Sequence, residues 1–536
     1  MLNAVSSSIA THPEHERAWG KKMAAVQKTK LVEHPKKTNI LFVTPEYRGL
    51  AKVGGLGDVS AALPEALLAH HDVRILIPGY RQITNSGYHI TIVDSLEAYA
   101  GLPACKIGRM QINKGPIIYV VLCPELYDRE GNAYGDANGR DWSDNAVRFA
   151  RLSFAAAEIA QGRGALKWNP NLVHANDWAT ALTPAYMAWR GQTTPSVFTI
   201  HNLAHQGLCD PQLVHTLGLP ASAFSIESME FYGKLSFLKA GIVYANHITT
   251  VSQTYAREIT TPAFGCGLDG LLKQKFEQGL LSGILNGIDE SWEPQSDPHL
   301  VKSFSAQQWD HKKMNTRHVE QVFNLPHSTH PLFAVVSRLA HQKGVDLTIN
   351  IADSIVNAGG RLVVMGCGES ELEARMMQLA KRHPHQVGVD IGFDEITARR
   401  IFAGSDFLLM PSRFEPCGLS QLYAQRCGSL PIARHTGGLA DTIEDGLSGF
   451  LFHEPNVESY RGAVNRALQV FKRPELLSAM RCRAMAAPVF WRQSIQPYSA
   501  LYQRLLTRVE RQWSAISAVG RNAQAELARR ELPWPA

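Results

Sequence analysis

Arg338, Lys343 and Glu415 are the residues of this sequence whose charges and spacing best suit chemistry on a phosphate-bearing substrate. The two cations lie five residues apart, in a loop that continues into Gly344. Neighbouring cations repel each other unless an anion lies between them, and at an effective dielectric of about 20 a charge ~4 Å away contributes roughly 4 kcal/mol per pair. In a group transfer, this pair would stabilise the negative charge that develops on a departing diphosphate. A solvated loop end without a ligand is the alternative interpretation.

Glu415 lies in the segment 411–424, between an apolar run and a stretch of helical composition. Gly418 allows a ligand to approach the backbone closely. The first N–H groups of a helix have no partner within it and carry partial positive charge. We therefore expect the N–H groups of Leu419 and Ser420 to bind a diphosphate while Glu415 faces the uncharged part of the same ligand. The alternative is an ordinary loop whose glutamate is only solvated.

A second glycine-rich turn, residues 52–58, opens a helix near the start of the chain. It follows a β-rich run at 39–44 and precedes another at 72–78, which is the pattern of a β–α–β unit. Gly54 and Gly55 permit a tight turn, and Lys52 could reach a phosphate as a point charge. The turn matches neither the P-loop nor the G-x-G-x-x-G pattern, so a nicotinamide dinucleotide is disfavoured.

Three polar residues end further predicted strands of the same half. Asp177 lies near the end of the stretch 172–178, which is predicted to be a strand leading into a polar loop, His201 follows 196–200, and Asn286 follows 282–285. Ligands of open parallel sheets bind beyond the carboxyl ends of the strands, so Asp177 and His201 are expected to face one crevice. For either residue alone, a simple cap or loop hydrogen bond is the alternative.

The elements that must position these residues form two series of alternating strands and helices. A patternless stretch rich in Pro, Ser and His separates the series. The sequence thus predicts an α/β protein with two Rossmann-like doubly wound domains facing a cleft. The expected parts are a mobile N-terminal extension (1–37), a first domain (38–290), a junction (291–330), a second domain (331–490), a C-terminal helical segment (491–512) and a tail (513–536).

Composition narrows the range of partners. The net charge is +6, but residues 1–37 hold seven Lys or Arg against three Glu, so the body is nearly neutral and nucleic-acid binding is not expected. No apolar run approaches the ~20 residues that cross a bilayer, so no membrane association is expected. The eight cysteines form no C-x-x-C pair, which suits a reducing cytoplasm and favours neither zinc nor disulfides. We expect no cofactor and no metal site.

Taken together, the motifs resemble those of bacterial glycogen synthases and plant starch synthases from about residue 38 to about residue 510. The matching pieces are Lys52-Val-Gly-Gly-Leu56, Asp177-Trp178, His201-Asn-Leu203, Ser337-Arg-Leu339, Gln342-Lys-Gly344, Arg413-Phe-Glu-Pro-Cys-Gly-Leu419 and Thr436-Gly-Gly-Leu-Ala-Asp441. Each piece is modest, but their order makes the set specific.

The resemblance implies the GT-B glycosyltransferase fold, with the active site between the domains. It also implies transfer of glucose from ADP-glucose to the non-reducing end of an α-1,4-glucan such as glycogen, with retention of configuration. Arg338, Lys343, Glu415 and His201 would be catalytic. The residues expected to bind the nucleotide sugar are Lys52, Gly54, Gly55, Asp58, Asp177, Asn286, Cys417, Gly418, Leu419, Ser420, Thr436 and Gly437.

Within that resemblance, Arg338 and Lys343 stabilise the leaving ADP, and the main chain of His201 supports positive charge at the anomeric carbon. A same-face displacement, in which the leaving phosphate takes the acceptor proton, is favoured. A double displacement through a carboxylate nucleophile stays open.

Two residues depart from related patterns. Val53 replaces the usual Thr of the first motif, and Tyr423 stands where many other retaining enzymes of this fold carry a second Glu. The Tyr favours the synthase branch. Two alternatives to a glycogen synthase remain: a retaining GT-B glycosyltransferase with another donor or acceptor, and a catalytically silent glucan-binding protein.

Overall fold

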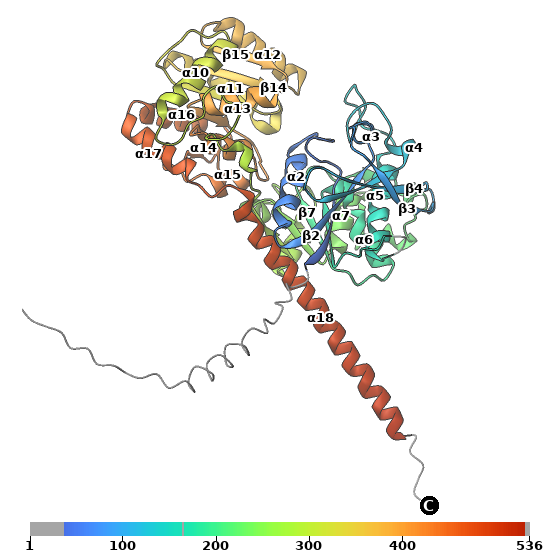
Figure 1. Cartoon of the computed structure of the whole chain (residues 1–536). Helices are drawn as coiled ribbons and strands as arrows, with labels where there is room; N and C mark the ends of the chain where they lie inside the picture. The colour runs from blue at the N-terminus through green and yellow to red at the C-terminus, as the bar shows by residue number, and fades with distance from the viewer. Residues whose placement is uncertain (1–36, 163–165, 531–536) are drawn as a thin grey trace, which may run out of the picture. The chain divides into compact units, whose positions relative to one another are not determined.

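The structure is a computed structural model that describes residues 37–162 and 166–530. Its first sheet contains β1 (Thr38–Val43), β2 (His71–Pro78), β3 (Thr91–Leu96), β4 (Cys105–Gln111), β5 (Ile117–Leu122), β6 (Leu172–Asn176), β7 (Ser196–Ile200), β11 (His247–Thr250) and β12 (Leu281–Gly283). The strand order is β12-β11-β7-β6-β1-β2-β5-β4-β3. Figure 1 labels β2, β3, β4 and β7 of this sheet. β6 and β7 are parallel neighbours, so the loops after both strands leave the same edge of the sheet. We call this sheet with its helices the N-terminal lobe.

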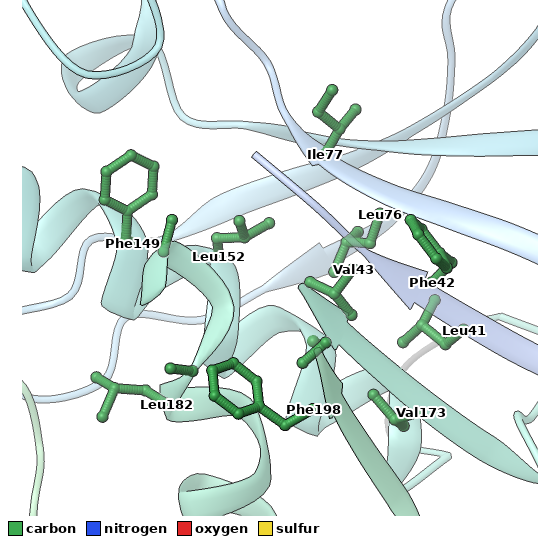
Figure 2. Packing of buried hydrophobic residues seen from close by; sticks show 14 of the residues in the cluster. Leu41, Phe42, Val43, Leu76, Ile77, Phe149, Leu152, Val173, Leu182 and Phe198 are labelled. Carbon is green, nitrogen blue, oxygen red and sulfur yellow. The ribbon is translucent and has the colours of Figure 1, made fainter. Parts of the chain in front are cut away.

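The core of the N-terminal lobe is built around β1, whose residues 40–43 are fully buried. A parallel strand covered on both faces is apolar throughout, which explains the continuous run of Ile, Leu, Phe and Val. Figure 2 shows Val43 among side chains of β7 and of helices α5 (Asn145–Ala160) and α6 (Leu182–Trp189).

The C-terminal helix α18 (Trp491–Arg530) also belongs to this core. Its residues Tyr498 and Tyr502 are fully buried against the N-terminal lobe. Tyr502 packs edge-on against His174 of β6, with ring centroids 5.9 Å apart. The Tyr502 hydroxyl and His174 Nδ1 form a hydrogen bond of 2.8 Å. The end of the chain therefore stabilises the sheet with which the chain begins.

The second sheet contains β13 (Leu332–Val336), β14 (Arg361–Gly366), β15 (Val387–Ile391), β16 (Phe407–Met410), β17 (Leu430–Arg434) and β18 (Phe450–Phe452). Its order is β15-β14-β13-β16-β17-β18, and every pairing is parallel. Its helices include α11 (Val345–Asn357), α12 (Ser370–Arg382), α13 (Glu395–Gly404), α16 (Val457–Phe471) and α17 (Pro474–Met485). We call this sheet with its helices the C-terminal lobe. The two sheets correspond to the two Rossmann-like domains that the sequence predicts.

Some elements differ from the sequence-based expectation. The stretch predicted to be a patternless junction contains α10 (Trp309–Val322), which packs against α13. The helical segment expected at 491–512 is part of the longer α18, which continues through most of the expected tail. At one edge of the first sheet β4 is antiparallel to both β3 and β5, so that edge is not doubly wound.

The expected N-terminal extension falls, except for Lys37, outside the described residues, as do residues 531–536 of the expected tail. Within the described part of the chain, every helix is too short or too polar to cross a lipid bilayer.

Candidate active site

The glycine-rich turn of the N-terminal lobe is held by a buried carboxylate. The N–H groups of Val53 and Gly54 donate to Glu46 Oε2 at 2.8 and 2.9 Å, and the hydroxyl of Tyr134 donates to Glu46 Oε1 at 2.8 Å. Glu46 is 3% exposed. Hydrogen bonds to a charged acceptor are about twice as strong as neutral ones, so Glu46 fixes the turn from which α2 (Gly55–Leu67) begins.

Lys52 and Asp58 of this turn form an ion pair. Lys52 Nζ lies 2.8 Å from Asp58 Oδ2, and the lysine side chain keeps 30% of its surface exposed. Burial raises the pKa of Asp58, while the charge of Lys52 acts in the opposite direction. Asp58 therefore orients a partly exposed cation beside Gly54 and Gly55.

Asp177 is buried, and its backbone is unusual. It has φ 60 and ψ 175, in a region of the backbone map that is almost restricted to glycine, and such strain is found mainly at functional sites. Its side chain accepts from the N–H group of Trp178 at 3.0 Å. Burial raises the pKa of Asp177 to about 8, and the charge of Glu46 adds to this effect. The carboxyl group is therefore largely protonated at neutral pH.

His201 is held by Asn176, the last residue of β6. His201 Nε2 lies 3.1 Å from Asn176 Oδ1, while Asn176 Nδ2 donates to the carbonyl oxygens of Val43 and His174. The amide oxygen can only accept, so His201 carries its proton on Nε2. Burial lowers the pKa of His201 to about 3, which keeps the ring uncharged.

In the C-terminal lobe, Lys343 and Glu415 form a direct ion pair. Lys343 Nζ donates to Glu415 Oε2 at 2.5 Å, and the hydroxyl of Ser412 donates to the same oxygen at 3.0 Å. The glutamate side chain is 7% exposed and the lysine side chain 19%. Lys343 therefore has a negatively charged partner within the protein, the carboxylate of Glu415, before any ligand binds.

Arg338 is exposed but connected to the same loop. It donates through Nη2 to Gln342 Oε1 at 3.3 Å, and Gln342 Nε2 donates to the carbonyl oxygen of Phe414 at 3.3 Å. Burial lowers the pKa of His205, and the charge of Arg338 lowers it further. Arg338 is therefore close to the segment that follows His201, although it belongs to the other lobe.

The loop that carries Lys343 packs tightly on the loop that carries Glu415. Gly344 has φ +67, and a Cβ atom there would lie 2.1 Å from the carbonyl oxygen of Pro411. Arg413 reinforces the contact by a two-point ion pair with Asp346, at 2.7 and 2.8 Å. Only glycine fits at position 344. The close approach that it allows brings the loop of Lys343 next to the loop of Glu415.

Helix α14 (Ser420–Arg426) begins where the sequence predicts a phosphate-binding helix start. Gln421 Nε2 donates to the carbonyl oxygens of Cys417 and Gly418, both at 3.0 Å. The thiol of Cys417 is buried, and burial raises its pKa to about 12. A Cβ atom on Gly55 would lie 3.6 Å from Leu419 Cδ1. The glycine-rich turn of one lobe therefore faces the helix start of the other.

Asn286 has an unsatisfied buried amide. Its side chain is 7% exposed, and its Oδ1 atom has no hydrogen-bond partner in the described part of the structure. Asn286 also lies beside Cys417, whose thiol is near the backbone of Asn286. A buried amide oxygen without a partner costs about 1–3 kcal/mol, so a ligand hydroxyl at this point would be favourable.

Thr436 and Gly437, which the sequence places among the sugar-nucleotide contacts, are engaged by Glu258. Thr436 Oγ1 donates to Glu258 Oε1 at 2.9 Å, and the N–H group of Gly437 lies 3.1 Å from each carboxylate oxygen. Glu258 ends α8 (Gln253–Glu258) of the N-terminal lobe. Both predicted ligand groups thus have a protein partner in this structure.

Sequence reasoning missed four residues that hold the site: Glu46, Asn176, Glu258 and Ser412. Two of them lie at or just beyond predicted strands, as Asn176 precedes Asp177 and Glu46 follows the run at 39–44 by two residues. That position was a usable signal. Nothing in the local sequence connects Glu258 with Gly437. In the described ranges no group of three or more His, Cys, Asp or Glu side chains is arranged to hold a metal ion.

Comparison with known proteins agrees with this geometry. Residues 39–274 match a family model described as the starch synthase catalytic domain, and residues 319–480 match one described as glycosyl transferases group 1. A glycogen synthase of Pseudomonas syringae pv. syringae is 61% identical over 469 residues, which cover 88% of this chain and 97% of that protein. A glycogen synthase of Pseudomonas aeruginosa is 63% identical over 467 residues, which cover 87% of this chain and 91% of that protein.

A solved structure supports the same relationship. The catalytic domain of starch synthase IV from Arabidopsis thaliana, bound to ADP and acarbose, superposes with a TM-score of 0.78 at 29% identity. The match covers 88% of this chain and all of that one. A sucrose-phosphate synthase from Thermosynechococcus elongatus has a TM-score of 0.56 at 15% identity, which supports the fold alone. The chain belongs to the glycogen and starch synthase family of retaining glycosyltransferases.

Proposed function

We propose that this enzyme transfers glucose from ADP-glucose to the non-reducing end of an α-1,4-glucan, with retention of configuration. The observation that carries the proposal is the Lys343–Glu415 ion pair, a cation and a carboxylate held 2.5 Å apart in a buried loop. The family membership adds the donor and the acceptor, since close relatives are glycogen synthases and the starch synthase neighbour was bound to ADP.

The donor diphosphate would lie between the two lobes. Lys52 with Gly54 and Gly55 contacts it from one side, and the N–H groups of Leu419 and Ser420 contact it from the other. The 3.6 Å approach of a Gly55 Cβ position to Leu419 supports this arrangement. Anions bind well at the start of a helix because the N–H groups there have no partner within the helix.

The glucose would lie beside Glu415, His201, Asp177 and Asn286. A sugar hydroxyl would satisfy the unpaired Asn286 Oδ1, and the protonated carboxyl of Asp177 can donate a hydrogen bond. An uncharged His201 ring adds no positive charge near an anomeric carbon that is itself becoming positive. Asp58 acts indirectly, because it orients Lys52.

The reaction proceeds by same-face displacement through a state in which the bond to the leaving phosphate is largely broken. Lys343 and Arg338 stabilise the charge that accumulates on ADP, which is the kind of interaction that accelerates a reaction most. The leaving phosphate oxygen takes the proton of the acceptor hydroxyl. This chemistry needs no separate base, and Glu415 keeps Lys343 in position for the departing phosphate.

The location we infer for the enzyme is the cytoplasm. All eight cysteines lie in the described ranges and all are free thiols. Reduced thiols are typical of cytosolic proteins.

Labelled donors test the proposed function. Purified enzyme is incubated with glycogen and either ADP-glucose or UDP-glucose labelled in the glucose. We expect label in the polymer with ADP-glucose, released again by an enzyme that cuts only α-1,4 bonds. Label that enters only from UDP-glucose, or a product resistant to that enzyme, would refute the proposal.

A further inference from the structure

Helix α8 of the N-terminal lobe holds both ends of the short helix α15 (Gly437–Thr442) of the C-terminal lobe. At the start of α15, Glu258 accepts from Thr436 Oγ1 and from the N–H group of Gly437. Near its end, Asp441 accepts from the N–H group of Thr254 at 2.9 Å and from its hydroxyl at 2.6 Å. The two lobes are therefore joined by hydrogen bonds between side chains and backbone.

The opposite side of this turn packs on the backbone around Glu415. Gly437 has φ +44, and a Cβ atom there would lie 1.9 Å from the carbonyl oxygen of Glu415. The N–H group of Gly438 donates to that same oxygen at 3.1 Å. Ser252, at the start of α8, donates to the carbonyl oxygen of Pro416 at 2.6 Å. The turn held by Glu258 is therefore in direct contact with the main chain of Glu415.

Charge argues against a donor phosphate at this turn. The N–H group of Gly437 is shared between two carboxylate oxygens, and the N–H group of Gly438 is used by Glu415. A diphosphate there would have to displace a carboxylate whose negative charge repels it. Burial lowers the pKa of the nearby Arg434, and the charge of Glu258 acts in the opposite direction.

We propose that Glu258 is a positioning residue for the glucosyl transfer. Its carboxylate fixes the turn at 436–438 and, through that turn, sets the main chain of Glu415 relative to the N-terminal lobe that carries His201. This role rests on the proposed function. It gives Thr436 and Gly437 an indirect part in catalysis in place of direct contact with the sugar nucleotide.

The role predicts a particular kinetic signature. Loss of Glu258 leaves the proposed diphosphate contacts of Arg338 and Leu419 in place, so the KM for ADP-glucose changes little. It loosens Glu415, which lies beside the glucose in the proposed function and keeps Lys343 in position, and a misplacement of ~1 Å at a reacting centre can cost about a hundredfold in rate. We therefore expect kcat to fall by roughly ten- to a hundredfold.

Four variants of the full chain test this. Glu258→Ala removes the acceptor, Glu258→Gln keeps an oxygen at the same reach, and Glu258→Asp keeps the charge but is one methylene shorter. Arg257→Ala is the matched control, because Arg257 is an exposed neighbour on the same helix. The measurements are kcat, the KM for each substrate, the melting temperature and amide hydrogen exchange of peptides covering 411–424 and 434–443.

We expect Glu258→Ala to lower kcat and to speed exchange in both peptides, Glu258→Gln to restore part of each property, and Glu258→Asp to restore neither. Arg257→Ala should match the wild type. Unchanged exchange at 411–424 in Glu258→Ala would overturn the proposal, even if the wild type proved inactive with ADP-glucose. A lower KM for ADP-glucose in Glu258→Ala would also overturn it, because the carboxylate would then compete with the donor.

Discussion

Replacing the ionisable carboxyl of Asp177 with an amide, in Asp177→Asn, should stabilise the protein while impairing its activity. Asp177 is 8% exposed, and burial raises its pKa to about 8 from the ordinary 3.8. Between those two values the folded protein keeps a proton that the unfolded chain has released. Stability therefore falls as pH rises through this window, and Asp177→Asn removes that dependence because an amide does not ionise.

The pKa difference sets the size of the effect. The interval from 3.8 to about 8 spans about four pH units, and at about 1.4 kcal/mol per unit the buried charge costs on the order of 5 kcal/mol at pH 8 and above. The asparagine oxygen can still accept from the N–H group of Trp178, as the aspartate does at 3.0 Å. The variant should thus gain stability without losing this hydrogen bond.

The assay is the melting temperature between about pH 5 and pH 9. Asp141→Asn is the control, since Asp141 is an exposed aspartate of the same lobe. We expect the difference between Asp177→Asn and wild type to grow with pH, while Asp141→Asn follows the wild type. Transfer activity should drop only in Asp177→Asn. A difference that stays constant with pH would refute the buried, protonated carboxyl.

Three further substitutions test separate parts of the site. Glu46→Gln weakens the two hydrogen bonds that hold the N–H groups of Val53 and Gly54. The variant should therefore have a kcat/KM for ADP-glucose about tenfold lower, with the KM for glycogen unchanged. An unaltered KM for ADP-glucose would contradict this. Tyr502→Phe leaves the Nδ1 atom of His174 without its partner and should cost about 1–3 kcal/mol of stability, seen as a lower melting temperature with kcat preserved. Arg338→Ala should reduce kcat for transfer but not the melting temperature, because the guanidinium is exposed and, among the described residues, makes one weak side-chain hydrogen bond at 3.3 Å.

Much of the fold follows from local sequence pattern. The strands around residues 40, 75, 174 and 198 are apolar runs that end in polar or glycine-rich turns, and the structure confirms all of them. The helix α10 is not recognisable from its sequence because most of its residues are charged or polar, with few apolar residues at helical spacing. Only its packing against α13 makes it recognisable.

Local sequence also indicates some residues of the candidate site, but not the tertiary contacts between them. Lys343 and Glu415 are predictable because each stands in a loop with a distinctive glycine, but their direct pairing is a tertiary contact between residues far apart in the chain. The same applies to Glu258 and Gly437, which lie 179 residues apart. The pKa values of Asp177 and His201 depend on burial by other elements, so sequence alone indicates the residues but not their protonation states.

The central claim is that cations of the C-terminal lobe neutralise the departing ADP. The most direct test is kcat for glucose transfer from ADP-glucose to glycogen by Lys343→Ala, compared with wild type at saturating substrates. Loss of a group that stabilises transition-state charge predicts a fall of about a hundred- to a thousandfold. A kcat within about twofold of wild type, far smaller than such a group supplies, would contradict the account.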